Sequence, residues 1–478
     1  MAARLETSQR GYQLLLAMGA VGLGLLAGLD PRLAIAAAIG LGFVVLVLGD
    51  VTFGLCVFAV ISFLDLLPAL GGSLLSFSKI VGFLLFVSWL AKVTSSQDVR
   101  NDFLAAHPIF TFTLGAFVGF AAFSLLWAED PAAGHTPLLR YALNLVLFLI
   151  VYTAVRTPKQ FMWTIAAYVA GAAAAAAYAL LSPPPQTVYN DVTRATGTFG
   201  DPNELAAVLV PGLILAGALA ITLKRAPMLR IAAVAAGALS AVGIFLTLSR
   251  GGLIALGFAL LVSLFVAGRW RVQAFIVTAV VVVGSFAYFG YVASDQAVSR
   301  VTQFEGGTGR TDLWQIGRRM VADKPVTGVG VGNFQTASVH YLLAPGAIKR
   351  DEFIVDQPKA AHNTYLQVQT ELGGIGFVLF VAIVAFALLS MLRAAKIFER
   401  LGERALELVA RCLFIAVAGV LAADFFISEQ YSKQLWLLLA LGPGLLGVAT
   451  GLMSGADKDP DAPGDPTWRP DERRPASR

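Results

Sequence analysis

Residues 361–392 read AHNTYLQVQTELGGIGFVLFVAIVAFALLSML, and this stretch decides the fold. Its first residues are polar and end a long polar segment, whereas the residues after Gly373 are almost all apolar. A helix of ~20 apolar residues can cross the ~30 Å hydrocarbon core of a bilayer. The stretch therefore predicts a membrane-spanning helix whose first turn, beside His362, lies at the boundary between water and lipid.

The whole chain has the composition of an integral membrane protein. Of its 478 residues, 57% are hydrophobic and 14% are charged, which leaves too little polar surface to coat a water-soluble globule. Apolar runs predict an all-α, polytopic membrane helix bundle of about fourteen (about 12–14) spans. These runs cover residues 11–29, 33–48, 51–69, 75–92, 107–127, 137–155, 160–181, 203–222, 229–248, 251–268, 272–292, 364–392, 406–428 and 433–453.

Lys and Arg residues gather in every second connection between these runs, as the positive-inside rule expects for cytoplasmic loops. We therefore expect both termini in the cytoplasm. The intervening loops, at 128–136, 182–203, 249–250, 293–362 and 429–432, then face the periplasmic or extracytoplasmic side. The net charge of +5 is spread over many connections and does not form a stripe, which argues against nucleic acid as a partner.

The chain divides into three predicted regions. Residues 1–181 form an N-terminal transmembrane bundle, and residues 182–453 form a second transmembrane region that contains the outer loop 293–362. Residues 454–478 have almost nothing apolar to bury and are expected to be a disordered cytoplasmic tail. Small side chains in the run 172–177 predict a closely packed helix face.

Three arginines fall on the side of the membrane where the positive-inside rule does not place them: Arg194, Arg250 and Arg310. Each has a simpler explanation, because Arg194 suits a solvated loop and Arg250 could extend its side chain to the membrane surface. The alternative is an anion site, since a guanidinium fits phosphate oxygens bidentately. Arg310 opens a predicted amphipathic helix over residues 311–323.

His362 is the candidate catalytic group. An unperturbed imidazole titrates near ~6.5, so its neutral form can accept a proton at neutral pH. The alternative is that His362 only caps the following helix, helped by Asn363 and Thr364, which suit a helix start. Asn203, in the Asp201-Pro202-Asn203 turn, also suits a helix start, and both asparagines are candidate substrate-binding residues.

Other potential reactive groups are weaker candidates. Cys56 and Cys412 lie in apolar runs, and the four histidines have no metal-ligand spacing, so no metal site is predicted. The mixed charges at 349–359 suit a solvated surface. The glycine-rich stretch 325–334 predicts a turn, but no Gly-Lys-Ser/Thr follows it, so it is not a phosphate loop. Asp424 is a candidate partner for one of the arginines.

In order along residues 190–380, the chain resembles the bacterial O-antigen ligase and Wzy-type polysaccharide polymerase superfamily. The resemblance rests on Arg194 with GTFGDPN at 197–203, SRGG at 249–252, GRTDLW at 309–314, DKP at 323–325, GVGVGNF at 328–334 and HN at 362–363. His362, Asn363 and Gly373 also fit the ligase pattern of His, then Asn, Ser or Gln, then nine residues and Gly. Ligases commonly carry Thr or Val three residues further on, where this chain has Gly376, and this difference favours a polymerase.

The resemblance implies a GT-C-like, inverting glycosyl transfer without metal or cofactor, outside the inner membrane of a bacterium. The donor would be a glycan on undecaprenyl diphosphate. By position, Arg194, Arg250 and Arg310 would contact phosphates, with Arg250 also acting in catalysis, and His362 would activate the acceptor hydroxyl. A polysaccharide copolymerase is a further partner that the family implies.

We predict first a polymerase that joins lipid-linked repeat units. The alternatives with the same donor chemistry are an O-antigen ligase that uses lipid A-core and an oligosaccharyltransferase that uses a protein acceptor. A lipid-linked glycan flippase or other transporter belongs to another class and predicts ionisable groups near the middle of the bilayer. A structural subunit of a glycan assembly complex is the remaining alternative.

Overall fold

The computed structural model describes residues 21, 24, 28, 31–64, 77–95, 103–182, 194–302, 310–342 and 359–458. These residues form helices and connections without a strand, as the all-α prediction requires. The bounds are α2 Pro31–Gly49, α3 Val51–Ile61, α4 Phe77–Ser95, α5 Phe103–Ala106, α6 Pro108–Phe123, α7 Pro131–Ala154, α8 Pro158–Leu181, α9 Pro202–Thr222, α10 Pro227–Leu246, α11 Arg250–Val266, α12 Arg271–Ala287, α13 Asp295–Thr302, α14 Arg310–Asp323, α15 Phe334–Leu342, α16 Thr364–Leu401, α17 Arg404–Ala423 and α18 Lys433–Lys458.

Within the described residues, nine helical segments are long and apolar enough to cross a membrane, and three shorter segments are apolar as well. The predicted total of about fourteen spans remains a prediction, because the first predicted run lies mostly outside the described residues. The weakest predicted boundary, between the runs 33–48 and 51–69, is a true helix break. The Asp50 carboxylate begins α3 by accepting a hydrogen bond of 2.8 Å from Thr52 N.

Helix starts in the bundle follow a common local rule. A side-chain cap precedes Pro at the first position of α7, α8 and α9, where the caps are Asp130, Thr157 and Asp201. Proline has no N–H to leave unsatisfied there, and the cap satisfies the next free N–H groups. α18 ends at Lys458, five residues beyond the predicted boundary at 453, and the rest of the predicted tail lies outside the described residues.

Close contacts between small residues hold the centre of the bundle together. A Cβ added to Gly212 in α9 would lie 2.6 Å from the Cβ of Ala172 in α8, and one on Gly243 in α10 would lie 3.3 Å from that of Ala176. Ala172 and Ala176 are fully buried. The alanine run 172–177 is therefore a packing face, as predicted, because small side chains let helix backbones approach closely.

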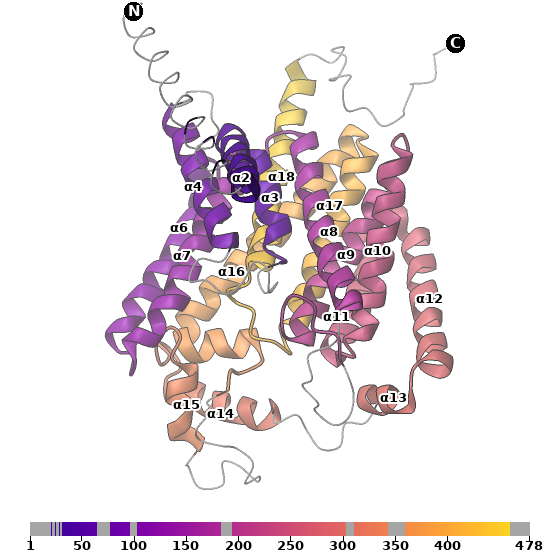
Figure 1. Cartoon of the computed structure of the whole chain (residues 1–478). Helices are drawn as coiled ribbons and strands as arrows, with labels where there is room; N and C mark the ends of the chain where they lie inside the picture. Colours follow the sequence, from indigo (N-terminus) through magenta and orange to yellow (C-terminus); the bar gives the residue numbers. More distant parts are fainter. Residues whose placement is uncertain are drawn as a thin grey trace, which may run out of the picture.

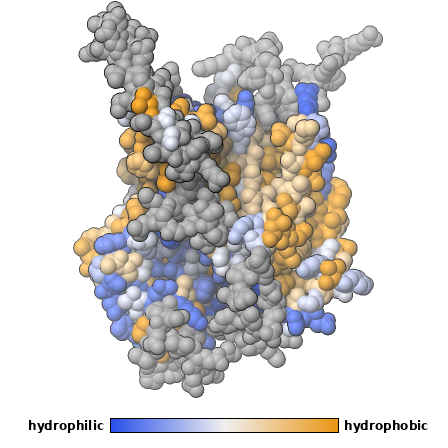
Figure 2. Space-filling view, in the orientation of Figure 1, coloured by the Kyte–Doolittle hydropathy of each residue, from blue (hydrophilic) through white to orange (hydrophobic). Residues whose placement is uncertain are grey.

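The outer surface of the bundle is apolar on its sides. α12 has no fully buried residue, so it lies at the edge of the bundle with most of its surface facing outward. Figure 2 shows hydrophobic surface over the side formed by α10 and α12, and hydrophilic surface at the end that carries α14 and α15. This distribution suits a bundle surrounded by lipid with one polar end in water.

Connections between the helices separate into two groups at opposite ends of the bundle (Figure 1). At one end, Arg411 in α17 donates to the carbonyl of Val266 at 2.7 Å, and Arg269 pairs with the buried Glu407 at 3.0 Å. At the other end lie α14, α15 and the starts of α9, α11, α16 and α18. The compartment that each end faces remains a prediction.

The amphipathic helix predicted at 311–323 is confirmed as α14. Its apolar side, with Leu313, Ile316 and Met320, is buried, and Gly317 lies so close to Leu366 of α16 that an added Cβ would be 2.7 Å from it. α14 therefore packs against the bundle. Along the chain, α13 precedes it and α15 follows it in the predicted outer loop.

Candidate active site

Residues 194–203 form a compact turn against the junction of α10 and α11. The Arg194 Nε donates to the carbonyl of Thr247 at 2.8 Å, and its Nη2 donates to Asn203 Oδ1 at 3.1 Å. Gly197 and Gly200 adopt φ values of +55° and +75°, which L-residues rarely reach. Since Asp201 then begins α9, the turn and two helices are held as one unit.

Arg250 is the first residue of α11, as the near absence of a loop in Thr247-Leu248-Ser249-Arg250 predicts. Ser249 begins this helix through a bond of 3.1 Å from Gly252 N to its Oγ, and its hydroxyl donates to Asn203 Oδ1 at 2.8 Å. The amide oxygen of Asn203 therefore ties Arg194 to the helix start that carries Arg250.

His362 stands between α14 and α16. Trp314 of α14 donates its indole N–H to the carbonyl of Ala361 at 3.1 Å, and Asn363 accepts from Leu366 N at 3.0 Å. His362 itself has a φ of +47°, which is uncommon for a residue with a Cβ. Because a bond on each side fixes the backbone around it, the imidazole is held in a defined place.

The loop 424–432 closes this side of the site. Thr364 Oγ1 donates to the carbonyl of Ile427 at 3.0 Å and accepts from Glu429 N at 2.8 Å. Phe426 lies against Gly251, where an added Cβ would be 2.9 Å from its own Cβ, and its ring centroid is 6.5 Å from that of Trp314. Phe426 therefore packs between the start of α11, next to Arg250, and α14.

The glycine-rich segment, residues 325–334, pairs with the first part of α16. Val329 N donates to Thr370 O at 2.9 Å, Gly330 N to Glu371 O at 2.8 Å, and Gly374 N to Pro325 O at 2.8 Å. Gly373 has a φ of +60° and bends α16 there, and an added Cβ would lie 2.2 Å from Val326 O. The glycines at 328 and 373 thus allow two backbones to touch.

Four arginines form the arginine cluster, defined as Arg194, Arg250, Arg300 and Arg310. Burial and the positive charges of the other three arginines, against the opposing effect of Asp201, together lower the pKa of Arg194 to about 10. Burial also lowers the pKa of Arg310 and of Arg300, and Arg250 acts on both in the same direction. Guanidinium groups that repel one another in this way suit an anion, and anion binding by this cluster remains a prediction.

Arg310 of the arginine cluster lies close enough to His362 to affect the pKa of its imidazole. Burial lowers the imidazole pKa below its ordinary value of 6.5, the charges of Arg310 and Lys359 lower it further, and Asp201 raises it. The imidazole is therefore neutral at pH 7 and has a lone pair that can accept a proton. The fold therefore places four sequence-predicted residues within electrostatic reach of one another: His362, Arg194, Arg250 and Arg310.

Two members of the site were not predicted from the sequence. Arg300 in α13 was passed over, although it lies in the predicted outer loop, and its Nε is buried without a hydrogen-bond partner among the described residues. Asp201 was noted only as part of a turn, yet its charge acts on Arg194, Arg310 and His362. A basic residue on an amphipathic outer helix was the available signal for Arg300.

The remaining predicted residues have structural contacts. Asn203 and Asn363 hold the turn and the start of α16, and contact between either residue and substrate remains a prediction. Asp424 is fully buried, and neither of its carboxylate oxygens has a hydrogen-bond partner among the described residues. It therefore does not pair with a described arginine. Residues 349–358 of the mixed-charge segment lie outside the described residues, and Lys359 is exposed.

In the part of the chain that the structure describes, no three His, Cys, Asp or Glu side chains come close enough together to hold a metal ion. A search of curated proteins finds no match to the chain.

A comparison with protein families identifies the centre of the chain. Residues 235–381 match the family model described as O-antigen ligase. Over this range, the chain is similar to the O-antigen ligase and polymerase superfamily. The matched range includes Arg250, Arg300, Arg310 and His362, whereas Arg194 lies before it and contacts it through Thr247. The resemblance predicted over 190–380 is confirmed for this shorter range.

Proposed function

We propose that this protein is a membrane glycosyltransferase that moves a glycan from an undecaprenyl-diphosphate-linked donor to the hydroxyl group of an acceptor. The observation that carries the proposal is the arginine cluster beside a neutral, partly buried imidazole. A diphosphate brings negative charge that such a cluster can offset, and an acceptor hydroxyl needs a base. The family match supports a membrane enzyme of this general kind.

The proposed reaction is a single displacement. A ring nitrogen of His362 accepts the acceptor's hydroxyl proton as the oxygen forms a bond to the anomeric carbon. The bond from that carbon to the diphosphate oxygen breaks, and its electron pair leaves with the lipid diphosphate. The arginine cluster stabilises the negative charge that grows on this leaving group. Attack from the opposite face inverts the anomeric configuration, and no step requires a metal.

Polymerisation of lipid-linked repeat units is the first form of this proposal. In that reaction, the acceptor hydroxyl belongs to a second lipid-linked glycan. Ligation to lipid A-core is the second form, because the matched family model carries the description O-antigen ligase. Both forms place the site outside the inner membrane of a bacterium, and they share the donor and differ only in the acceptor.

The deciding experiment is incubation of the purified, reconstituted protein with one defined lipid-linked repeat unit. A ladder of products supports polymerisation. Product that appears only after lipid A-core is added supports ligation. His362→Ala should abolish product in either case while donor binding is retained, because the arginine cluster and not the imidazole holds the diphosphate. Movement of the lipid across the bilayer without a new glycosidic bond would overturn both forms.

A further inference from the structure

A second site lies beside the arginine cluster. A cavity of about 730 Å³, here called the α4–α7 cavity, is lined by α4, α7, the turn 198–199 and the segment 428–434. This volume falls within the range of ~300–1,000 Å³ typical of small-molecule sites. None of the residues predicted from the sequence as catalytic or substrate-binding lines it.

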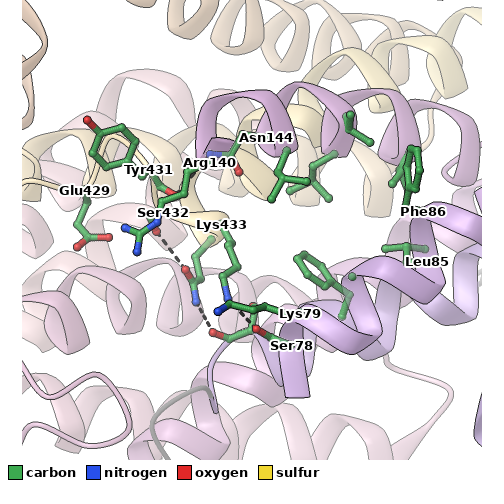
Figure 3. Close-up of a pocket in the computed structure, with 18 of the residues that line it drawn as sticks. Ser78, Lys79, Leu85, Phe86, Arg140, Asn144, Glu429, Tyr431, Ser432 and Lys433 are labelled. Atoms are coloured by element: carbon green, nitrogen blue, oxygen red, sulfur yellow. Dashed lines mark hydrogen bonds between the residues drawn. The ribbon is translucent and has the colours of Figure 1, made fainter. Parts of the chain in front are cut away.

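The lining of the α4–α7 cavity is divided into a charged end and an apolar end. Figure 3 shows Lys79, Arg140, Glu429 and Lys433 toward one end, and Leu85 and Phe86 at the other. More apolar side chains continue that wall, among them Phe83, Leu147 and Ile150. A site with this division suits an amphiphile, whose headgroup and hydrocarbon chain need opposite surroundings.

The charged end of the cavity carries excess positive charge. Lys79, Arg140 and Lys433 supply three cations, and Lys433 is oriented by donating to Ser78 Oγ at 3.0 Å. Against them stand the carboxyl groups of Glu204 and Glu429. Among the described lining residues, these three cations outnumber the two carboxyl groups. The balance favours an anionic headgroup.

The charged end lies next to the arginine cluster, separated from it by the turn 194–203. Thr198 and Phe199 of this turn line the cavity, while Arg194 of the same turn belongs to the cluster. Glu204 follows Asn203 directly, and Glu429 N donates to Thr364 at the start of α16, two residues after His362. An anion in the α4–α7 cavity therefore lies near the imidazole of His362. The cations next to it are Lys79, Arg140 and Lys433, not those of the arginine cluster.

We propose that the α4–α7 cavity binds the acceptor as a second phosphorylated lipid, with its phosphate near Lys79, Arg140 and Lys433 and its chain along the apolar wall. This inference rests on the proposed function, since a transferase that joins two lipid-borne glycans must hold both lipids at once. The arginine cluster holds the donor, and the cavity holds the acceptor. Carboxyl, amide and hydroxyl groups at the charged end suit the sugar hydroxyls that follow the phosphate.

Lipid counting tests the proposal without turnover. The full-length protein is loaded with undecaprenyl monophosphate in phosphatidylcholine nanodiscs, and native mass spectrometry counts the retained polyprenyl lipids. We expect two per wild-type chain, one for Lys79→Glu/Arg140→Glu and one for Arg250→Gln/Arg310→Gln. Lys224→Glu, an exposed residue in the connection between α9 and α10, is the matched control and should retain two. One lipid in wild type, or two in Lys79→Glu/Arg140→Glu, overturns the proposal.

Two further measurements test which kind of ligand the α4–α7 cavity binds. Inorganic phosphate at the same concentration should displace neither lipid, because the apolar wall contributes to binding; displacement by phosphate alone would mean a site for a soluble anion. In transfer assays, Lys79→Glu/Arg140→Glu should raise the acceptor KM about tenfold and leave the donor KM unchanged. An equal rise in both, or in neither, overturns the assignment. If wild type transfers no glycan, the proposed function fails, while the lipid counts still decide the cavity.

Discussion

Arg194 and Asn203 are joined by a hydrogen bond of 3.1 Å from Nη2 to Oδ1, and the same oxygen accepts from Ser249 at 2.8 Å. One amide oxygen therefore connects a guanidinium of the arginine cluster to the start of α11. Ser249 is buried and Arg194 is partly buried, so losing this acceptor leaves two polar groups unsatisfied.

Asn203→Ala should lower both stability and activity. We expect a loss of about 1–3 kcal/mol in unfolding free energy for each donor left without a partner. The activity of Arg194→Lys should depend on Asn203, because both residues set the same turn. A double-mutant cycle on kcat/KM should give a coupling of at least ~0.5 kcal/mol. Additive effects of the two substitutions would show that Asn203 does not act through Arg194.

The rate of transfer should fall in acid with an apparent pKa below 6.5, because the pKa of His362 is lowered and the neutral imidazole is the reactive form. Arg310→Gln removes a charge that lowers this pKa, so the acid limb should move to higher pH. Asp201→Asn removes a charge that raises it, so the limb should move to lower pH. Rate profiles between about pH 4.5 and 8 measure both shifts. Shifts of both profiles in the same direction, or no shift in either, would show that the imidazole of His362 is not the group that titrates.

Gly373→Ala should prevent correct folding of the site end. The added Cβ meets Val326 O at 2.2 Å in a backbone of φ +60°, so strain and overlap combine. Gly402→Ala is the control, since Gly402 has a φ of +76° and nothing lies within 4 Å of an added Cβ. It should cost only the conformational strain of about 1–2 kcal/mol. Thermal unfolding in detergent compares the two, and equal losses would mean that contact with Val326 is unimportant.

Glu371 should hold the glycine-rich segment in place. Its carboxylate is 1% exposed and accepts bonds of 2.9 Å each from Gly332 N, Gln367 Nε2 and the Tyr431 hydroxyl. Glu371→Ala leaves these donors without their acceptor and should cost about 3 kcal/mol or more, whereas Tyr431→Phe removes one bond and should cost about 1 kcal/mol. Limited proteolysis should cut Glu371→Ala within 325–334 faster than Tyr431→Phe. Equal cleavage rates would show that Glu371 does not fix this segment.

Local patterns predicted much of the fold. The helix α14, the packing face at 172–177 and the break between α2 and α3 are each encoded within a few adjacent residues. The arginine cluster was also predictable in part, because a guanidinium at a lipid boundary is costly unless it has a partner. His362 was found by the change from polar to apolar sequence that follows it.

Contacts between distant segments were not predictable from the sequence. The pairing of residues 325–330 with 370–374 depends on backbone bonds, which leave no trace in side-chain pattern except the glycines themselves. Lys79, Arg140 and Lys433 come from three separate helices, each with an ordinary explanation as a solvated or interfacial charge. Only packing shows that they surround one cavity, because single-sequence periodicity carries no information about which helices are neighbours.

The bend of α16 at Gly373 has a mechanical consequence. A bilayer that becomes thinner or thicker changes the tilt of the helices it surrounds. The long apolar part of α16 begins beyond the bend, whereas residues 364–375 are fastened to the glycine-rich segment and to Ile427. We therefore expect tilting of the long part to be taken up near the bend at Gly373, so that the imidazole of His362 keeps its place when membrane thickness varies.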